Sequence, residues 1–167
     1  MSIAPRAIQY VTGTVPNYSY NVNGICGATA SAMWLKWYDN YVNNSYVPSS
    51  LTSSNGVALI QHLVSYIPSN SNAGQVSSGI YSYLGTQGIS HFPYTDYANE
   101  TTILSAVNGM GRPYILRIAG HPQYTNHWVT GYGYSQPSPG TIFAIVNDGW
   151  GSTGIQITMS YAANIVY

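Results

Sequence analysis

Charged side chains are scarce in this sequence of 167 residues. Only 5% of the residues are charged, four basic and four acidic, so the formal net charge is zero. A disordered chain combines high net charge with few aromatic residues, whereas this one contains 17 tyrosines and four tryptophans. A membrane-spanning helix needs roughly 18 or more consecutive apolar residues, and no stretch of the sequence approaches that length. The sequence therefore excludes disorder and a membrane span, and it predicts a globular protein.

The few basic residues also bear on possible partners. Lysine and arginine occur only at positions 6, 36, 112 and 117, too scattered to form the basic stripe of a nucleic-acid-binding surface. We therefore expect no nucleic-acid partner. Residues 1–5 lack the basic start and apolar run of a signal peptide. They begin either a cytoplasmic protein or a mature secreted form with an added start methionine, and the charge-poor composition favours the secreted form.

Cysteine occurs once, at position 26. A single cysteine cannot form a disulfide within the chain, so stability must come from packing. It also cannot supply a cysteine-rich zinc site, and no histidine pair has the i, i+4 or His-x-His spacing of a metal-binding motif. We expect no metal and no other cofactor. Cys26 is then either an inert, buried thiol or a reactive one.

The hydrophobic pattern changes near residue 113. Before that point apolar residues recur at three- and four-residue steps, as on one face of a helix. After it, short runs rich in Ile, Val, Tyr and Trp alternate with clusters of Gly, Pro and Ser, as in antiparallel strands joined by turns. We predict an α+β fold, helices first and a sheet after. The predicted helices cover 26–41, 56–66, 75–84 and 100–107, the last with Asn99 as N-cap, and the predicted strands cover 114–119, 127–134, 141–147 and 154–159.

Three residues in this arrangement can support nucleophilic catalysis. Cys26 begins the first long helix, where the positive end of the helix dipole favours the thiolate of a group whose free pKa is about 8.5. His127 opens a predicted strand and can hold the proton, pair with the thiolate and later protonate the leaving group. Asp148 closes the next strand and can accept from the second imidazole nitrogen, which fixes the ring. The small neighbours Gly24 and Gly27 leave room for a substrate, which favours a reactive Cys26.

Three segments carry these residues: 23–30 (NGICGATA), 126–132 (NHWVTGY) and 147–151 (NDGWG). In that order they resemble the nucleophile helix, the base-bearing strand and the third catalytic block of the papain-like clan of cysteine peptidases, and the resemblance extends over most of the chain. Bacterial members that process bacteriocin leaders usually have Asp in the third block, and streptopain has the similar VNWGWG. The resemblance implies a single catalytic domain, with a helical lobe at about 20–110 built around the nucleophile helix and packed on an antiparallel β lobe at about 111–167.

The resemblance leaves two positions open. Asp148 matches the papain register of the third catalytic residue, whereas the streptopain-like register places Asn147 there. Because neighbours in a strand point to opposite faces, we expect only one of them to reach the imidazole. The family normally has Gln six residues before the nucleophile, donating to the oxyanion, but this sequence has Tyr20 there. The side-chain amide of Asn21 is the candidate in its place, with Asn23 as the weaker alternative.

Three further residues are candidates for substrate binding. Gly24 leaves space for a substrate beside the nucleophile. His91 could line a pocket between the two lobes, where ligands often bind. Trp150 is expected either to shield the contact between His127 and Asp148 from water or to fill the core.

The resemblance implies a cysteine peptidase that cleaves a peptide or protein substrate through an acyl-enzyme on Cys26. The same catalytic residues also serve amidases and acyltransferases, so these remain alternatives. A third alternative is a catalytically inactive papain-like binding or toxin module. Many papain-like enzymes carry an inhibitory propeptide; the residues before Tyr10 are too few to serve as one, so we expect any propeptide to be removed or to lie outside this sequence.

Overall fold

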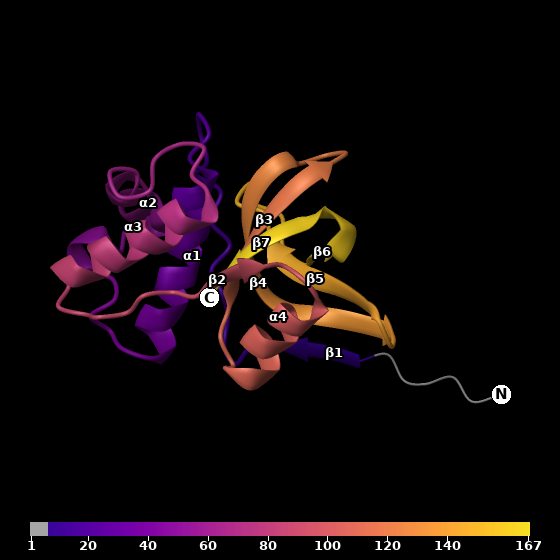
Figure 1. The fold of residues 1–167 in the computed structure, drawn as a ribbon. Helices are drawn as coiled ribbons and strands as arrows, with labels where there is room; N and C mark the ends of the chain where they lie inside the picture. The colour runs from indigo at the N-terminus through magenta and orange to yellow at the C-terminus, as the bar shows by residue number, and fades with distance from the viewer. Residues whose placement is uncertain (1–6) are drawn as a thin grey trace.

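The computed structural model describes residues 7–167, apart from the side chain of Ser54, and has the expected α+β architecture. Helices α1 to α3 gather in one half of the molecule and the sheet forms the other, with α4 beside the sheet (Figure 1). The α-helices are α1 (Cys26–Tyr41), α2 (Val57–Leu63), α3 (Ala73–Thr86) and α4 (Glu100–Leu104). The strands are β1 (Ala7–Tyr10), β2 (Thr95–Tyr97), β3 (Tyr114–His121), β4 (Thr125–Ser138), β5 (Thr141–Asn147), β6 (Ile155–Thr158) and β7 (Ala162–Val166). Single 3-10 turns lie at Ser49–Leu51, Ser54–Gly56 and Met159–Tyr161, and a π-helical turn follows α4 at Ser105–Gly109.

The four predicted helices are confirmed, and three of them, α2, α3 and α4, have ends that differ from those predicted. Helix α1 has the predicted bounds, whereas α2 is shorter and begins after Gly56, whose φ of 69° is left-handed. Helix α3 begins earlier than predicted because Asn72 and Gln75 form a reciprocal capping box at its start. Helix α4 has the predicted N-cap, since the Asn99 side chain accepts from the backbone amide of Thr102 at 2.9 Å.

The strands form one antiparallel sheet in the order β2-β7-β3-β4-β5-β6, and β1 pairs with the later part of β4. Strands β3 to β6 match the four predicted strands. The sequence pattern does not predict β1, β2 or β7, because β1 and β2 are exposed throughout and β7 changes from half-buried to buried along its length, so none of them alternates like a half-buried strand. The sheet therefore includes residues 7–10 and 95–97, which lie outside the range 111–167 expected for the β lobe.

Helix α1 lies at the centre of the molecule, between the other helices and the sheet (Figure 1). Residues 27–35 are all buried, as in a helix that is covered on every side. Two hydrogen bonds attach it to the sheet half. The indole nitrogen of Trp34 donates to the carbonyl of Pro113 at 3.0 Å, and the Thr130 hydroxyl of β4 donates to the carbonyl of Ala30 at 2.7 Å. The N-terminal end of α1 is thereby held against β4.

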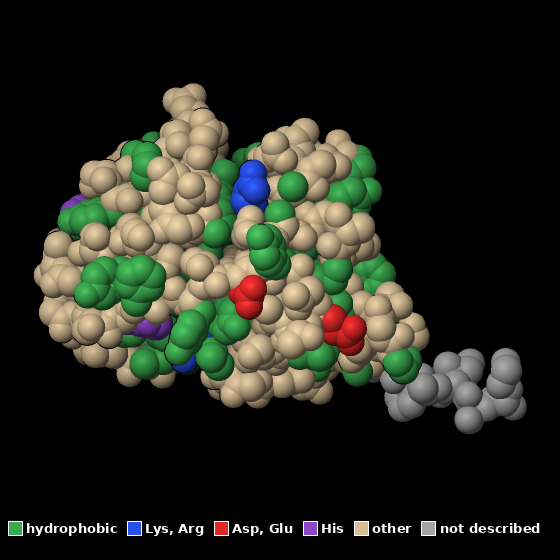
Figure 2. Space-filling view, viewed as in Figure 1, with side chains coloured by type: hydrophobic (Ala, Val, Ile, Leu, Met, Phe, Trp, Pro, Cys, Tyr) green, Lys and Arg blue, Asp and Glu red, His purple; other side chains and the backbone are tan. Residues whose placement is uncertain are grey.

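The surface carries few charges, as the composition requires. The view in Figure 2 is dominated by neutral and apolar side chains, with one basic side chain where the helical half meets the sheet half. Among residues 7–167 the single ion pair joins Lys36 and Asp39, at 2.8 Å. In the same part of the chain, no helix combines the length and the apolar character needed to cross a bilayer.

Candidate active site

Cys26 is the first residue of α1, at the end that meets β4. The chain turns into the helix at Gly24, whose φ of 77° favours glycine. No side chain caps the helix, because Ile25 in the N-cap position makes no capping bond. The backbone N–H groups of Trp128, Gly27 and Cys26 itself act on the half-buried sulfur and lower the pKa of the thiol. The sulfur thus occupies the place where a helix start concentrates its free N–H groups.

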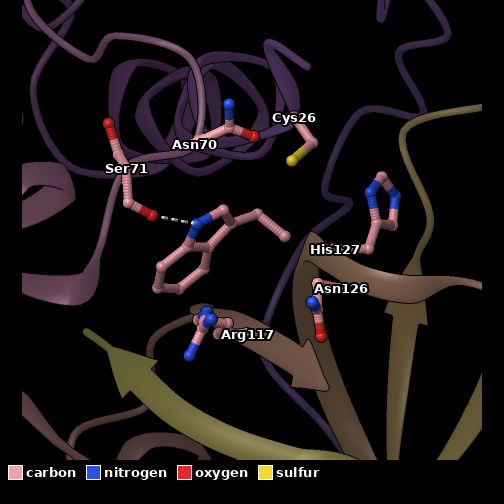
Figure 3. A pocket seen from close by; sticks show the side chains of 7 residues that line it. Cys26, Asn70, Ser71, Arg117, Asn126 and His127 are labelled. Atoms are coloured by element: carbon pink, nitrogen blue, oxygen red, sulfur yellow. Dashed lines mark hydrogen bonds between the residues drawn. The ribbon is translucent and has the colours of Figure 1, made fainter. Parts of the chain in front are cut away.

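His127 lies near the start of β4 and is only 4% exposed. Its Nε2 is 2.6 Å from the backbone carbonyl oxygen of Asp148. Because a carbonyl oxygen only accepts, Nε2 must carry the proton, and in the neutral ring Nδ1 is an acceptor. In Figure 3 the ring of His127 presents a nitrogen on the side of Cys26, and both residues line one pocket. The structure therefore brings together a thiol and an imidazole whose free nitrogen can accept a proton.

The carboxylate of Asp148 makes no hydrogen bond to His127 in the described residues, which differs from the role expected for that side chain. Its Oδ1 accepts from the backbone amides of Trp150 and Ser152, at 2.8 and 3.0 Å, and its Oδ2 accepts from the Tyr124 hydroxyl at 3.0 Å. The carboxylate closes the loop after β5, and the loop in turn presents the Asp148 carbonyl to the imidazole. Asp148 orients His127 through its main chain, which the pattern of side chains cannot indicate.

Asn147, the alternative to Asp148, points away from the imidazole. Its Nδ2 donates to the carbonyls of Val15 and Pro16, at 3.2 and 3.0 Å, and its Oδ1 accepts from Thr153. In the same segment as Val15, the side chain of Asn17 donates to the carbonyl of Gly151 at 2.8 Å. The segment before α1 is thus tied to the loop that carries Asp148, and Asn147 has a structural role in that tie.

Two aromatic rings pack against the imidazole. Trp150 stacks on His127 with ring centroids 4.2 Å apart and an angle of 18° between planes, and Tyr124 lies nearly parallel to His127 at 5.6 Å. Trp150 is 49% exposed, so it covers the histidine from solvent and does not fill the core. The pKa of Tyr124 is raised to about 12, mainly by burial and to a smaller extent by the hydrogen bond to the Asp148 carboxylate. Tyr124 therefore stays a hydroxyl donor.

The side-chain amide of Asn21 is unusual because its buried Nδ2 has no hydrogen-bond partner in residues 7–167. It lies against the loop after β5, since a Cβ placed on Gly149 would be 3.0 Å from this nitrogen. Buried donors without a partner are rare in folded proteins and call for an explanation. Asn21 does not line the pocket of Cys26, but its free N–H is available next to the loop that orients His127.

The pocket that contains the thiol has a volume of about 200 Å³ (Figure 3). Sequence reasoning did not identify most of its lining, although a charged residue inside the apolar run of β3 was a usable signal for Arg117. Gly24 does not line the pocket but lies beside the lining residue Asn70, since a Cβ on Gly24 would be 3.7 Å from Oδ1 of Asn70. The lining residues are Cys26, Asn70, Ser71, Arg117, Asn126, His127 and Trp128.

His91 is not part of this pocket. Its ring packs against Trp34, Tyr38 and Tyr46 inside the helical half, with centroid distances of 5.3, 5.1 and 6.0 Å. Its Nδ1 is bonded to the Tyr46 hydroxyl at 2.8 Å. The histidine expected as a pocket residue between the lobes is thus a packed, hydrogen-bonded group of the helical half.

Burial shifts both the thiol of Cys26 and the imidazole of His127 toward their neutral forms. It raises the pKa of the Cys26 thiol, and the three backbone N–H groups on the sulfur oppose this only in part. Burial also lowers the pKa of His127, against the opposite effects of the Asp148 carbonyl and carboxylate. The helix start was expected to favour a thiolate; burial acts against it, and the Asp148 carboxylate acts for a charged imidazole.

These shifts predict that the fold loses stability on acidification. Burial lowers the pKa of both His91 and His127, so below about pH 6.5 the unfolded chain binds protons that the folded chain does not. The stabilisation is present above pH 6.5 and is lost as the pH falls toward the folded-state pKa values. Thermal unfolding should show a midpoint that falls between pH 7 and pH 5, and less steeply in His91→Gln. Equal slopes for the variant and the parent would contradict the assignment to His91.

The site has no evident metal-binding component. Among residues 7–167 no group of three or more His, Cys, Asp or Glu is placed to hold a metal ion. No protein-family model matches the chain, and no curated protein is significantly similar to it. The chemistry of the site is inferred from its own residues: a thiol, an oriented base and a free amide donor.

Proposed function

We propose that this protein is a papain-like cysteine peptidase in which Cys26 is the nucleophile and His127 the base. The observation that carries the proposal is the position of the thiol in one pocket with an imidazole whose other nitrogen is already bonded to a carbonyl. A buried cysteine that only fills space needs no oriented base beside it, whereas nucleophilic catalysis does. The burial of His127 under Trp150 supports the same proposal, because it holds one ring orientation.

In the proposed reaction, Nδ1 of His127 takes the thiol proton as the sulfur of Cys26 bonds to the carbonyl carbon of a peptide. The C–N bond breaks, and the amine leaves with the proton from His127. A water molecule that gives a proton to His127 then attacks the thioester carbon; the C–S bond breaks, the acid is released, and His127 returns the proton to the sulfur of Cys26. Backbone N–H groups at the start of α1 are the candidate donors to the oxyanion; Nδ2 of Asn21, the side-chain donor expected from the sequence, is buried outside the pocket lining.

The rate of Cys26 alkylation by iodoacetamide tests this proposal without a known substrate. Because His127 accepts the thiol proton and its pKa is lowered, the rate should hold from pH 8 to about 6.5 and fall at more acid pH as the imidazole is protonated. In His127→Ala the rate at pH 7 should drop about tenfold or more, and it should recover only where the buried thiol ionises by itself.

Two variants serve as controls for this measurement. Cys26→Ala removes the only thiol and should take up no label. His62→Ala changes an exposed histidine on α2 and should alkylate like the parent. Equal rates for His127→Ala and the parent at pH 7 would contradict the proposal and leave an inactive binding module. A panel of peptides, side-chain amides and added amine acceptors then separates a peptidase from an amidase or an acyltransferase.

A further inference from the structure

The pocket beside Cys26 contains one fully charged side chain, that of Arg117. Arg117 lies on β3 directly opposite Trp128 of β4, so the two side chains share one face of the sheet. The indole of Trp128 is held toward the helical half by its bond to the Ser71 carbonyl at 2.9 Å. In Figure 3, Cys26 and Arg117 lie on opposite sides of the pocket. A group bound at Arg117 would therefore sit across the pocket from the thiol.

The guanidinium of Arg117 has no acidic partner among the residues that the structure describes. Among residues 7–167 it takes part in no ion pair and no side-chain hydrogen bond, although it is half-buried. The other polar side chains of the lining at Asn70, Ser71 and Asn126 are neutral. The Asp148 carboxylate is already bonded to two backbone amides and a hydroxyl. Five N–H donors in a fixed planar group are thus left for water or for a ligand.

We infer that this pocket binds a carboxylate of the substrate, with Arg117 as the residue that determines specificity. The inference rests on the proposed function of Cys26 and His127. A carboxylate matches the planar guanidinium and can form two parallel hydrogen bonds with it. An acidic side chain next to the scissile bond and the free C-terminal carboxylate of a peptide both supply this group. Arg117 is one of only four basic residues in a sequence of which 5% is charged, and it lies in this pocket.

Two alkylating reagents of similar size test the inference without a substrate. Iodoacetate carries a carboxylate and iodoacetamide a neutral amide. The rate of Cys26 alkylation by iodoacetate divided by the rate with iodoacetamide therefore reports attraction of an anion to the pocket. We expect Arg117→Gln to lower this ratio about tenfold at low salt, with little change in the iodoacetamide rate. Arg117→Lys keeps the charge but not the planar fork and should give an intermediate ratio. Added salt should lower the ratio in the parent and leave it nearly constant in Arg117→Gln.

Arg112→Gln is the matched control, because it removes a basic side chain that lies near His91 and does not line the pocket. Its ratio should equal that of the parent. An unchanged ratio in Arg117→Gln would overturn the inference even if Cys26 depends on His127 as proposed. A ratio that falls in Arg112→Gln as much as in Arg117→Gln would also overturn it, since the effect would then be general. Alkylation that is independent of His127 would instead overturn the proposed function.

Peptide substrates separate the two sources of the carboxylate. We expect the parent to cleave a peptide with Glu beside the scissile bond about tenfold faster than its Gln counterpart, and Arg117→Gln to lose that preference. If the preference is instead for a free over an amidated C-terminus, the bound group is the terminal carboxylate. Equal cleavage of all four peptides by the parent would overturn the inference.

Discussion

Replacing Asp148 with alanine is expected to destabilise the fold by about 3–5 kcal/mol and to remove most of the reactivity of Cys26. The carboxylate is 2% exposed and accepts three hydrogen bonds, two from the backbone of its own loop and one from Tyr124. Without it, two part-buried N–H groups and the Tyr124 hydroxyl lose their acceptor. The loop then no longer holds the Asp148 carbonyl at Nε2 of His127. Denaturant unfolding and the alkylation rate of Cys26 at pH 7 measure the two effects.

Asp148→Asn is the decisive companion variant. An amide oxygen can still accept from the amides of Trp150 and Ser152, and the Tyr124 hydroxyl can turn to accept from the new NH₂. We expect a loss of only about 1 kcal/mol and an alkylation rate at pH 7 within about threefold of the parent. The pKa of His127 should fall further, because the carboxylate charge that raises it is gone. A loss of reactivity as large as that of Asp148→Ala would mean that the carboxylate itself serves the imidazole.

Gly131→Ala is expected to destabilise the protein by about 3 kcal/mol or more. Gly131 lies on β4 opposite Tyr114 of β3, and a Cβ at this position would overlap the tyrosine ring. Tyr114 is fully buried, and its hydroxyl donates to the carbonyl of Gly133 at 2.7 Å, so the ring cannot move aside. For a chain of this size such a loss lowers the midpoint of thermal unfolding by about 6–12 °C. Calorimetry would measure it.

Gly85→Ala controls for the general effect of adding a methyl group. Gly85 lies near the end of α3, is exposed, and has no atom within 4 Å of the added carbon. Alanine is favoured over glycine in a helix, so this change should be neutral or stabilise the fold by about 0.5–1 kcal/mol. A midpoint for Gly131→Ala equal to that of Gly85→Ala would contradict the close packing of Tyr114 on β4.

The parts of the fold that could be predicted are those with a long, regular pattern. Helix α1 has sixteen residues and a clear repeat, and its bounds were predicted correctly. Strand β2 has three residues, all exposed, and belongs to the sheet only because β7 pairs with it. A pattern of side chains carries no information about such pairing, since the partner strand lies about seventy residues away in the chain.

The candidate site was predictable to the extent that side chains define it. Cys26 and His127 have distinctive types and positions, and the structure places both in one pocket. The acceptor for His127 is a backbone carbonyl, a group that every residue possesses, so the prediction assigned the contact to the Asp148 carboxylate. The place of Arg117 in the pocket could not be predicted, because it depends on the register of β3 and β4, which sets Arg117 opposite Trp128.

The tie between the segment before α1 and the loop after β5 has a consequence for how the protein folds. The bond between Asn147 and Val15 spans 132 positions of the chain, and the bond between Asn17 and Gly151 spans 134 positions. Contacts between such distant residues form late, because a large loop must close first, and a fold that depends on them forms more slowly. During synthesis helix α1, which begins with Cys26, emerges early, but the carbonyl bonded to His127 is held in place only after the loop following β5 has formed. A nascent chain thus carries the thiol long before it has an oriented base.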